Sequence, residues 1–107
     1  MTQRRLQHAL TPIVRQIVAL AHPQCILLFG SAAKGEWRSD SDLDLLIVVD
    51  DSQQSDAVLD LLNTRVSREQ FPCDFLVATA DTLRRQRQNP GLIYRTILKE
   101  GRVVYAS

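Results

Sequence analysis

The stretch that decides the fold is residues 30–48, which read GSAAKGEWRSDSDLDLLIV. It places Asp40, Asp42 and Asp44 at alternate positions, directly before an apolar run. Alternate residues of a β-strand point to the same face, so Asp42 and Asp44 project side by side if the strand has already begun. Two carboxylates about 4 Å apart repel each other by about 4 kcal/mol at an effective dielectric constant near 20. A fold tolerates this arrangement if a cation fills the gap, and hard oxygen ligands suit Mg²⁺ or Mn²⁺.

Gly30 and Ser31 directly follow an apolar segment, residues 25–29, that is typical of a short strand. Glycine lets the backbone approach a ligand closely, and a helical turn over residues 31–34 would present free backbone N–H groups to an anion. An anion site joined by one loop to paired carboxylates suggests a metal-bound polyphosphate, clamped by two metal ions about 3.5–4 Å apart. A third carboxylate is then needed from a neighbouring strand, and Asp74, inside a later apolar run, is the candidate.

The remaining pattern predicts an α+β fold in which a small mixed β-sheet packs with helices. The sequence between the elements contains turn and capping residues rather than repeats or low-complexity tracts. Short apolar runs predict strands at residues 25–29, 43–49, 73–78 and 103–105. Apolar residues at helical spacing, together with cap signals, predict a helix near residues 58–66, a short basic helix that is capped by Thr79 or Asp81 and ends at Arg87, and a helix that starts at Asn89-Pro90 and ends at Gly101.

The N-terminal segment is also amphipathic, with apolar residues recurring at spacings of three and four. Thr11-Pro12 fits an N-cap followed by proline at the first helical position. We therefore expect two helical pieces here, with the firm one over residues 12–21. For the second long helix, Ser52 or Ser55 is expected near the start.

Composition favours one domain spanning residues 1–107. The chain has 107 residues and a formal net charge of +1, with 45% apolar and 23% charged residues, so nothing in it predicts a nucleic-acid or membrane partner. No apolar run approaches the roughly 18–20 residues that span a bilayer, and the first ten residues do not form a signal peptide. Cys25 and Cys73 each begin an apolar run, so both are expected to be buried and reduced, which favours the cytoplasm.

Two other motifs with similar residues are excluded by spacing. A calcium-binding EF-hand loop that begins at Asp40 would need glycine at its sixth position and glutamate at its twelfth, where this chain has Leu45 and Asp51. A Walker P-loop would need lysine and a hydroxyl residue after its second glycine, where this chain has Glu36 and Trp37.

Several of these residues have an alternative interpretation in which their role is structural rather than functional. The three aspartates of the opening stretch could form a solvated turn, with Asp40 as a cap, and Asp74 could be a salt-bridge partner. For Arg84, Arg85 and Arg87 a solvated helix face is favoured over an RNA contact. Trp37 lies in a polar loop that we expect to be flexible, where it could pack locally, stack on a base or contact a partner.

The pattern G-S-x9-S-D-x-D, followed by an apolar strand and a single aspartate on a later strand, resembles the nucleotidyltransferase superfamily that includes DNA polymerase β. The short length resembles its minimal nucleotidyltransferase branch. The resemblance implies the nucleotidyltransferase fold, with ATP as donor and two Mg²⁺ ions, or Mn²⁺ in their place. In residue terms it implies that Gly30 and Ser31 hold the triphosphate and that Asp42 and Asp44 bind both ions. Asp74 would complete the metal that activates the attacking hydroxyl.

The resemblance also implies a reaction and a partner. The α-phosphate passes to an acceptor and pyrophosphate leaves; the expected acceptor is a hydroxyl of a helical HEPN-type protein, modified with AMP in an antitoxin-like pair. A homo-oligomer is a further possible arrangement, and Lys34 or Arg38 could touch phosphate. Two alternatives remain: transfer to a small molecule or tRNA, and a non-catalytic antitoxin that neutralises its partner by binding alone.

Overall fold

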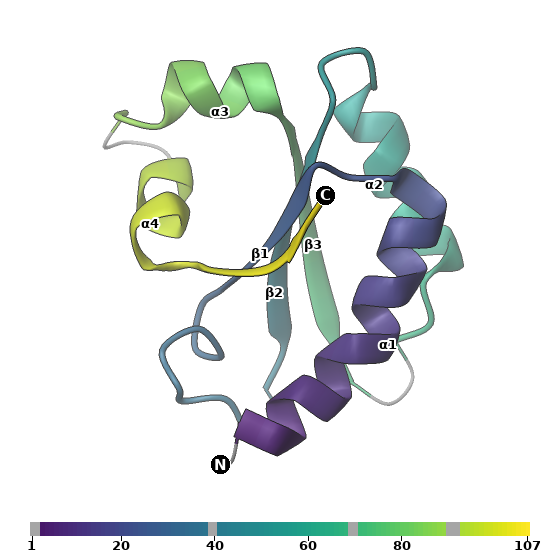
Figure 1. The fold of residues 1–107 in the computed structure, drawn as a ribbon, viewed down its shortest axis with the longest axis vertical. Helices are drawn as coiled ribbons and strands as arrows, with labels where there is room; N and C mark the ends of the chain where they lie inside the picture. The colour runs from purple at the N-terminus through teal and green to yellow at the C-terminus, as the bar shows by residue number, and fades with distance from the viewer. Residues whose placement is uncertain (1–2, 39–40, 69–70, 90–92) are drawn as a thin grey trace.

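The computed structural model describes residues 3–38, 41–68, 71–89 and 93–107. Its strands form one mixed sheet in the order β3-β2-β1-β4 (Figure 1). Strand β1 is antiparallel to both β2 and β4, whereas β2 and β3 run parallel. The bounds are Cys25–Phe29 for β1, Leu43–Val49 for β2, Cys73–Thr79 for β3 and Arg102–Ala106 for β4. The predicted α+β fold with a small mixed sheet is therefore confirmed.

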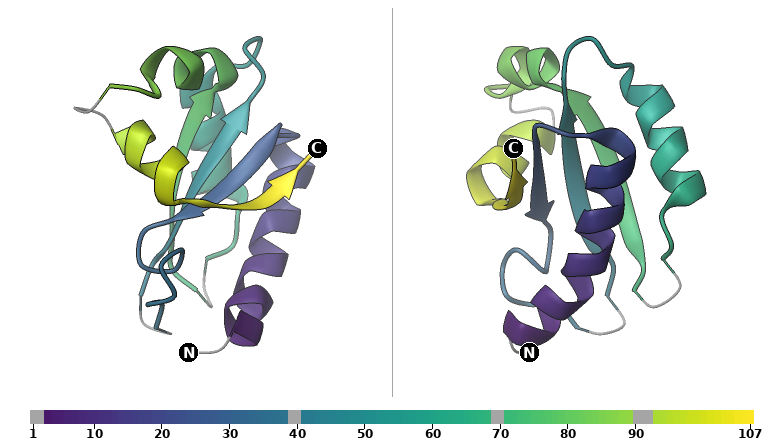
Figure 2. Two further views of the ribbon diagram at one scale, coloured as in Figure 1. Left: turned by 60° about the vertical axis from the view of Figure 1, so that its left-hand side comes forward. Right: turned by 45° about the vertical axis from the view of Figure 1, so that its right-hand side comes forward.

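Helices cover both faces of this sheet. Figure 2 shows α1 and α2 against one face and α3 and α4 against the other. The bounds are Gln3–Ala21 for α1, Ser55–Arg65 for α2, Ala80–Gln86 for α3 and Ile93–Glu100 for α4. Two hydrophobic clusters follow from this layering, a larger one under α1 and α2 and a smaller one in which Ile97 of α4 packs on Leu27 and Leu46.

Strand β2 is the centre of the core. All of its residues are buried except Asp44, which is half-buried. Such a nearly continuous apolar run is what a strand covered on both faces requires. Because side chains alternate, Leu45 and Ile47 point into the larger cluster, while Leu46 and Val48 point into the smaller one.

Helix α1 differs from the prediction, because it runs through Pro12 without a break. Thr11 does not act as an N-cap; its hydroxyl donates to the backbone oxygen of Gln7 at 2.8 Å, inside the helix. A proline in a helix interior removes a hydrogen bond, but here buried apolar residues lie on both sides of it, Leu10 before and Ile13 after. Packing of one continuous apolar stripe against the sheet therefore outweighs the local cost of the proline.

The other element ends agree with the prediction to within a few residues. The hydroxyl of Thr79 accepts from the backbone N–H of Thr82 at 3.2 Å, so Thr79 caps α3 as expected. Helix α2 begins at Ser55, one of the two serines expected near its start, and Gln54 before it makes no side-chain cap. The backbone N–H of Gly101 donates to the oxygen of Ile97 at 2.7 Å, where α4 ends. The predicted start of this helix at Pro90 lies outside the described residues.

Both cysteines are free, as predicted. Cys73 is buried, but Cys25 is only half-buried, so the expectation that both are buried was wrong for Cys25. Cys25 pairs with Ala106 of the edge strand β4, and a strand at the edge of a sheet leaves its neighbour less covered. Among the described helices, none is both long and apolar enough to cross a membrane.

Candidate active site

Asp44 of β2 and Asp74 of β3 lie directly opposite each other in the parallel strand pair. Both share a face with Leu46 and Ala78, whose side chains belong to the cluster under α3 and α4. Asp42 precedes Asp44 by two residues and stands just before β2 begins. Asp44 is half-buried, whereas Asp42 and Asp74 are exposed, so the pair lies at the border between core and solvent.

Asp44 lies close enough to Asp74 and Asp42 for their negative charges to affect its pKa. The pKa of Asp44 is raised above its ordinary value of 3.8, first by burial and then by the negative charges of Asp74 and Asp42. Both causes disfavour the charged form. The structure therefore brings the three predicted carboxylates into electrostatic contact at one end of the sheet.

The donor set at this place suits a hard divalent cation, because it consists of carboxylate oxygens. Within residues 3–38, 41–68, 71–89 and 93–107, however, no three His, Cys, Asp or Glu side chains already stand close enough to hold a metal ion. The oxygen donors and the negative charge of these carboxylates thus suit a divalent cation. The side chains would have to move closer together to bind it. Asp40, the third member of the alternating series, lies outside the described residues.

Gly30 brings the backbone against this group. It follows Phe29, whose register partner is Asp44, and it has a positive φ of 75°. A Cβ atom at this position would overlap the Oδ2 atom of Asp44 and lie 3.2 Å from its Cγ. Only glycine allows both this conformation and this close approach, so the loop after β1 starts in contact with the Asp44 carboxylate.

Ser31 begins a tight turn rather than a helix. The oxygen of Ser31 accepts from the backbone N–H groups of Lys34 at 3.1 Å and Glu36 at 2.9 Å, and that of Ala32 accepts from Gly35 at 3.2 Å. These bonds give the single turn that the sequence predicted over residues 31–34. They leave the amides of Ser31 and Ala32 without a backbone partner among the described residues. Free amides at the start of such a turn can bind an anion.

The basic residues near the site are partly engaged elsewhere. The ammonium group of Lys34 lies 3.9 Å from the carboxylate of Glu100, at the end of α4. Such an exposed pair contributes little to stability, but it gives Lys34 a partner other than phosphate. Arg38 is exposed, and its contact with phosphate stays a prediction.

The basic helix α3 is largely neutralised by acidic neighbours. Arg84 lies 3.5 Å from Asp51 and 3.2 Å from Asp81, and Arg85 lies 3.0 Å from Asp81. Ion-paired arginines at the surface favour the reading of a solvated helix face over that of an RNA contact.

Trp37 is the residue of this region that sequence reasoning placed wrongly. It was expected in a flexible polar loop, yet it is 1% exposed and belongs to the larger hydrophobic cluster. Of its three proposed roles, local packing is the one that the structure supports. The sequence did contain a signal, because a large aromatic side chain alone in a polar stretch buries considerable apolar area when it finds a place in the core.

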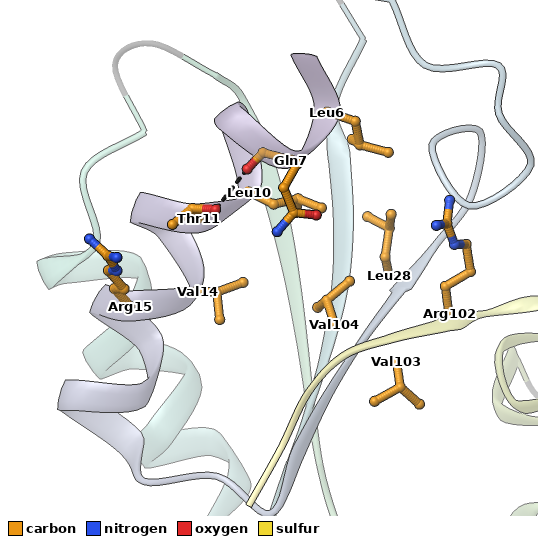
Figure 3. A pocket seen from close by; sticks show the side chains of 10 residues that line it. All are labelled: Leu6, Gln7, Leu10, Thr11, Val14, Arg15, Leu28, Arg102, Val103 and Val104. Carbon is orange, nitrogen blue, oxygen red and sulfur yellow. Dashed lines mark hydrogen bonds between the residues drawn. The ribbon is translucent and has the colours of Figure 1, made fainter. Parts of the chain in front are cut away.

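The groove shown in Figure 3 lies away from these carboxylates. It is a cavity of about 320 Å³ between α1 and β4, and its lining includes Leu10, Val14 and Val104 but none of the aspartates of the site. This groove is therefore not part of the candidate site.

Residues 13–107 match the family model described as polymerase beta, nucleotidyltransferase. The chain belongs to this nucleotidyltransferase family. Membership confirms the fold and the enzyme class that the resemblance, carried by Gly30, Ser31, Asp42 and Asp44, implied.

Two further similarities support this assignment. A protein of Methanocaldococcus jannaschii named "Putative protein adenylyltransferase" is 32% identical over 80 residues, which are 75% of this chain and 76% of that protein. A solved structure described as the crystal structure of a toxin-antitoxin with AMP-PNP has a TM-score of 0.55 at 18% identity, covering all of this chain and 75% of that one. At this level of identity the second similarity shows a shared fold.

Proposed function

We propose that this nucleotidyltransferase is an adenylyltransferase that moves AMP from ATP to a hydroxyl group of a partner protein, with Mg²⁺ as the bound ion. The observation that carries the proposal is the position of Asp44, which lies opposite Asp74 in the sheet and against the backbone of Gly30. The name of the archaeal relative and the AMP-PNP of the structural neighbour favour adenylyl transfer.

Each residue of the site has a role in this proposal. The free amides at Ser31 and the close backbone of Gly30 hold the triphosphate. Asp42 and Asp44 bind two divalent ions, Mg²⁺ or alternatively Mn²⁺, and Asp74 shares one of them. When bound, the ions neutralise the charge of the phosphates and of the carboxylates.

At the α-phosphorus the reaction forms one bond and breaks one, and a proton is transferred. The oxygen of the acceptor hydroxyl attacks the α-phosphorus of ATP, and the bond between that phosphorus and the bridging oxygen breaks, so that pyrophosphate leaves. The proton of the hydroxyl passes to a carboxylate oxygen of Asp74, which is exposed and can reach an incoming group.

In this proposal the acceptor hydroxyl belongs to a helical partner protein of the HEPN type. Residues 1–107 form a single minimal nucleotidyltransferase domain that modifies this partner, and the two proteins form an antitoxin-like pair. The structural neighbour is itself a toxin-antitoxin structure. Asp42 and Asp74 are exposed, so a hydroxyl presented by a partner protein, or by a second copy of the chain, can approach their carboxylates.

A second candidate is an antitoxin that acts by binding alone. One observation favours it: the described carboxylates do not stand ready-made around a metal position. Transfer to tRNA is less favoured, because Arg84 and Arg85 are ion-paired with aspartates.

The experiment that separates the candidates uses the chain together with the protein that co-purifies with it. Both are incubated with ATP labelled at the α-phosphate and with Mg²⁺, and the label on each protein is counted after electrophoresis. The test variant is Asp42→Asn/Asp44→Asn, and the matched control is Asp60→Asn, an exposed aspartate of α2.

Label on the partner that the double variant abolishes and the control retains supports the enzyme. If no label is transferred, and the double variant still inhibits its partner fully, the protein acts by binding alone. Label on a small molecule or on tRNA, added in parallel reactions, would identify a different acceptor.

A further inference from the structure

Trp37 is the only tryptophan of the chain, and its burial is unusual for its place in the sequence. Its neighbours Glu36 and Arg38 are exposed, while the indole is 1% exposed. Its ring stands 5.9 Å from that of Phe71, at an interplanar angle of 53°. Tilted aromatic pairs at this spacing are attractive beyond their buried area.

The indole N–H ties this side chain to the segment that carries Asp42. It donates to the backbone oxygen of Ser41 at 3.1 Å, and Ser41 immediately precedes Asp42. The backbone N–H of Ser41 in turn donates to the oxygen of Arg38 at 2.9 Å. The backbone N–H and the backbone oxygen of Ser41 are therefore both hydrogen-bonded, to Arg38 and to Trp37.

Phe71 ties the same indole to the segment that carries Asp74. It stands three residues before Asp74, and the next residue, Pro72, accepts from the backbone N–H of Leu43 at 2.8 Å. Leu43 lies between Asp42 and Asp44. The chain segments that lead into Asp42 and into Asp74 are thus linked twice. One link is this backbone hydrogen bond, and the other is the contact between Trp37 and Phe71.

The other end of the same loop begins at the turn that starts at Ser31. Ala32, the second residue after Gly30, is fully buried in the cluster that contains Trp37. The loop is therefore anchored in the core at Ala32 and at Trp37, with the turn before Trp37 and Asp42 after it.

From these contacts we infer that Trp37 is a positioning residue, which holds the Asp42 and Asp74 segments beside each other so that their carboxylates can draw together around a shared divalent cation. The indole does not touch the reacting groups. It acts through the oxygen of Ser41 on Asp42 and through Phe71 on Asp74. The inference rests on the proposed function, since it assigns the divalent ion to the same carboxylates.

A tryptophan that only fills space would behave differently. Replacement by phenylalanine would keep an aromatic ring near Phe71 and remove the hydrogen bond to Ser41. For a space-filling residue this change alters stability without altering cation binding. For a positioning residue it weakens cation binding, because partners that orient metal ligands typically contribute 10–100-fold in affinity.

The first measurement is a titration of the intrinsic fluorescence of the wild-type chain with Mn²⁺, which is paramagnetic and quenches nearby fluorophores. Excitation at a wavelength that tryptophan absorbs and tyrosine does not excludes Tyr94 and Tyr105, so the signal comes from Trp37, the sole tryptophan, beside Ser41. We expect saturable quenching that is lost in Asp42→Asn and retained in Asp60→Asn. Absence of saturable quenching, together with absence of Mn²⁺ binding by electron paramagnetic resonance, would overturn both this inference and the proposed metal site.

The second measurement compares Mn²⁺ affinity among variants by electron paramagnetic resonance of the free ion. We expect Trp37→Phe to bind Mn²⁺ about tenfold more weakly than wild type, and Phe71→Leu, which keeps the hydrogen bond, to show a smaller loss. The control is Leu62→Ala, a fully buried residue of α2 in the same cluster, which loses stability but keeps its affinity for Mn²⁺.

Circular dichroism confirms that each variant is folded at the temperature used. Wild-type affinity in both Trp37→Phe and Phe71→Leu, with binding still lost in Asp42→Asn, would overturn the role of Trp37 and leave the proposed function standing. A loss in Leu62→Ala as large as in Trp37→Phe would show that the effect comes from lowered stability, and would also overturn the role.

Discussion

Asp44 of β2 and Asp74 of β3 occupy opposite positions in a parallel strand pair and point to the same face of the sheet. Like charges placed directly opposite each other on neighbouring strands destabilise a sheet. The raised pKa of Asp44 reflects this repulsion in addition to burial. The fold therefore keeps an energetically unfavourable pair of carboxylates beside the backbone of Gly30. Carboxylates with perturbed pKa values are found preferentially at functional sites.

Asp44→Asn should stabilise the folded protein at neutral pH. The pKa of Asp44 is raised above 3.8 in the folded state, by burial first and then by Asp74 and Asp42. The folded chain therefore binds this proton more readily than the unfolded chain, so the ionised carboxylate lowers the free energy of unfolding at pH values above its folded pKa. That cost is absent below the ordinary value of 3.8.

The measurement is urea denaturation of wild type and Asp44→Asn across a pH series. We expect the variant to be the more stable protein at pH 7, and the difference to shrink toward zero as the pH falls below the ordinary range of aspartate. Asp60→Asn serves as the control for the loss of one negative charge. A variant that is less stable than wild type at pH 7 would show that Asp44 is held by favourable partners instead.

Gly30→Ala and Gly35→Ala form a matched pair. Both glycines have a positive φ, 75° and 78°, which costs other residues on the order of 1–3 kcal/mol. A Cβ at Gly35 meets nothing within 4 Å, whereas one at Gly30 overlaps the carboxylate of Asp44. We expect Gly35→Ala to lower the free energy of unfolding by about 1 kcal/mol and to retain activity.

Gly30→Ala should cost more stability than Gly35→Ala and should abolish nucleotidyl transfer, because Asp44 must move. Chemical denaturation and the label-transfer assay measure the two effects. Equal losses of stability in the two variants, with activity intact in both, would mean that the contact between Gly30 and Asp44 has no consequence.

The sequence predicted those parts of the site that depend on local spacing. Alternation placed Asp42 and Asp44 on one face, and the charge of Asp74 inside an apolar strand marked it as the third carboxylate. The family assignment confirms the class of fold and enzyme. The roles of the individual residues stay predictions, which the variants above and below test.

The sequence did not predict features that depend on tertiary packing. A cap signal at Thr11-Pro12 is local, whereas the continuity of α1 results from burial on both sides of it. Likewise, the polar neighbours of Trp37 indicated a flexible polar loop, whereas its burial results from packing in the larger hydrophobic cluster and against Phe71 in another part of the chain. Contacts between residues far apart in the chain are difficult to predict from the local pattern of polar and apolar residues.

Pro12→Ala tests the continuity of α1. Pro12 stands inside the helix Gln3–Ala21 and is itself exposed. Alanine restores a backbone donor and removes a helix-breaking residue, which is worth up to about 3 kcal/mol, less the entropy that proline removes from the unfolded chain. We expect the free energy of unfolding to rise by about 1–2 kcal/mol in urea denaturation. A loss of stability would indicate that Pro12 begins a separate helix.

Cys73 should react far more slowly than Cys25 with a thiol reagent. Burial raises the pKa of the Cys73 thiol to about 11; the positive charge of Arg68 opposes this shift and nearby carboxylates add to it. The Sγ atom of Cys73 donates to the backbone oxygen of Phe71 at 3.3 Å. Only the thiolate reacts. Burial also raises the pKa of Cys25, but that residue is half-buried and more accessible.

Peptide mass spectrometry after brief treatment with iodoacetamide at pH 8 measures this difference. We expect modification of Cys25 first, and of Cys73 only when urea unfolds the chain. Modification of Cys73 at the rate of Cys25 in the folded protein would show that the strand carrying Asp74 opens readily.

The most direct test of the account is the rate of nucleotidyl transfer in Asp74→Asn, measured in a single turnover with α-labelled ATP, Mg²⁺ and the co-purifying partner, beside wild type and Asp60→Asn. The account predicts a loss of at least about 100-fold in Asp74→Asn, of the size found when a charge-stabilising group is removed from a reaction site, and wild-type rates in Asp60→Asn. Transfer by Asp74→Asn at the wild-type rate would contradict it, because the carboxylate opposite Asp44 would then have no part in the reaction.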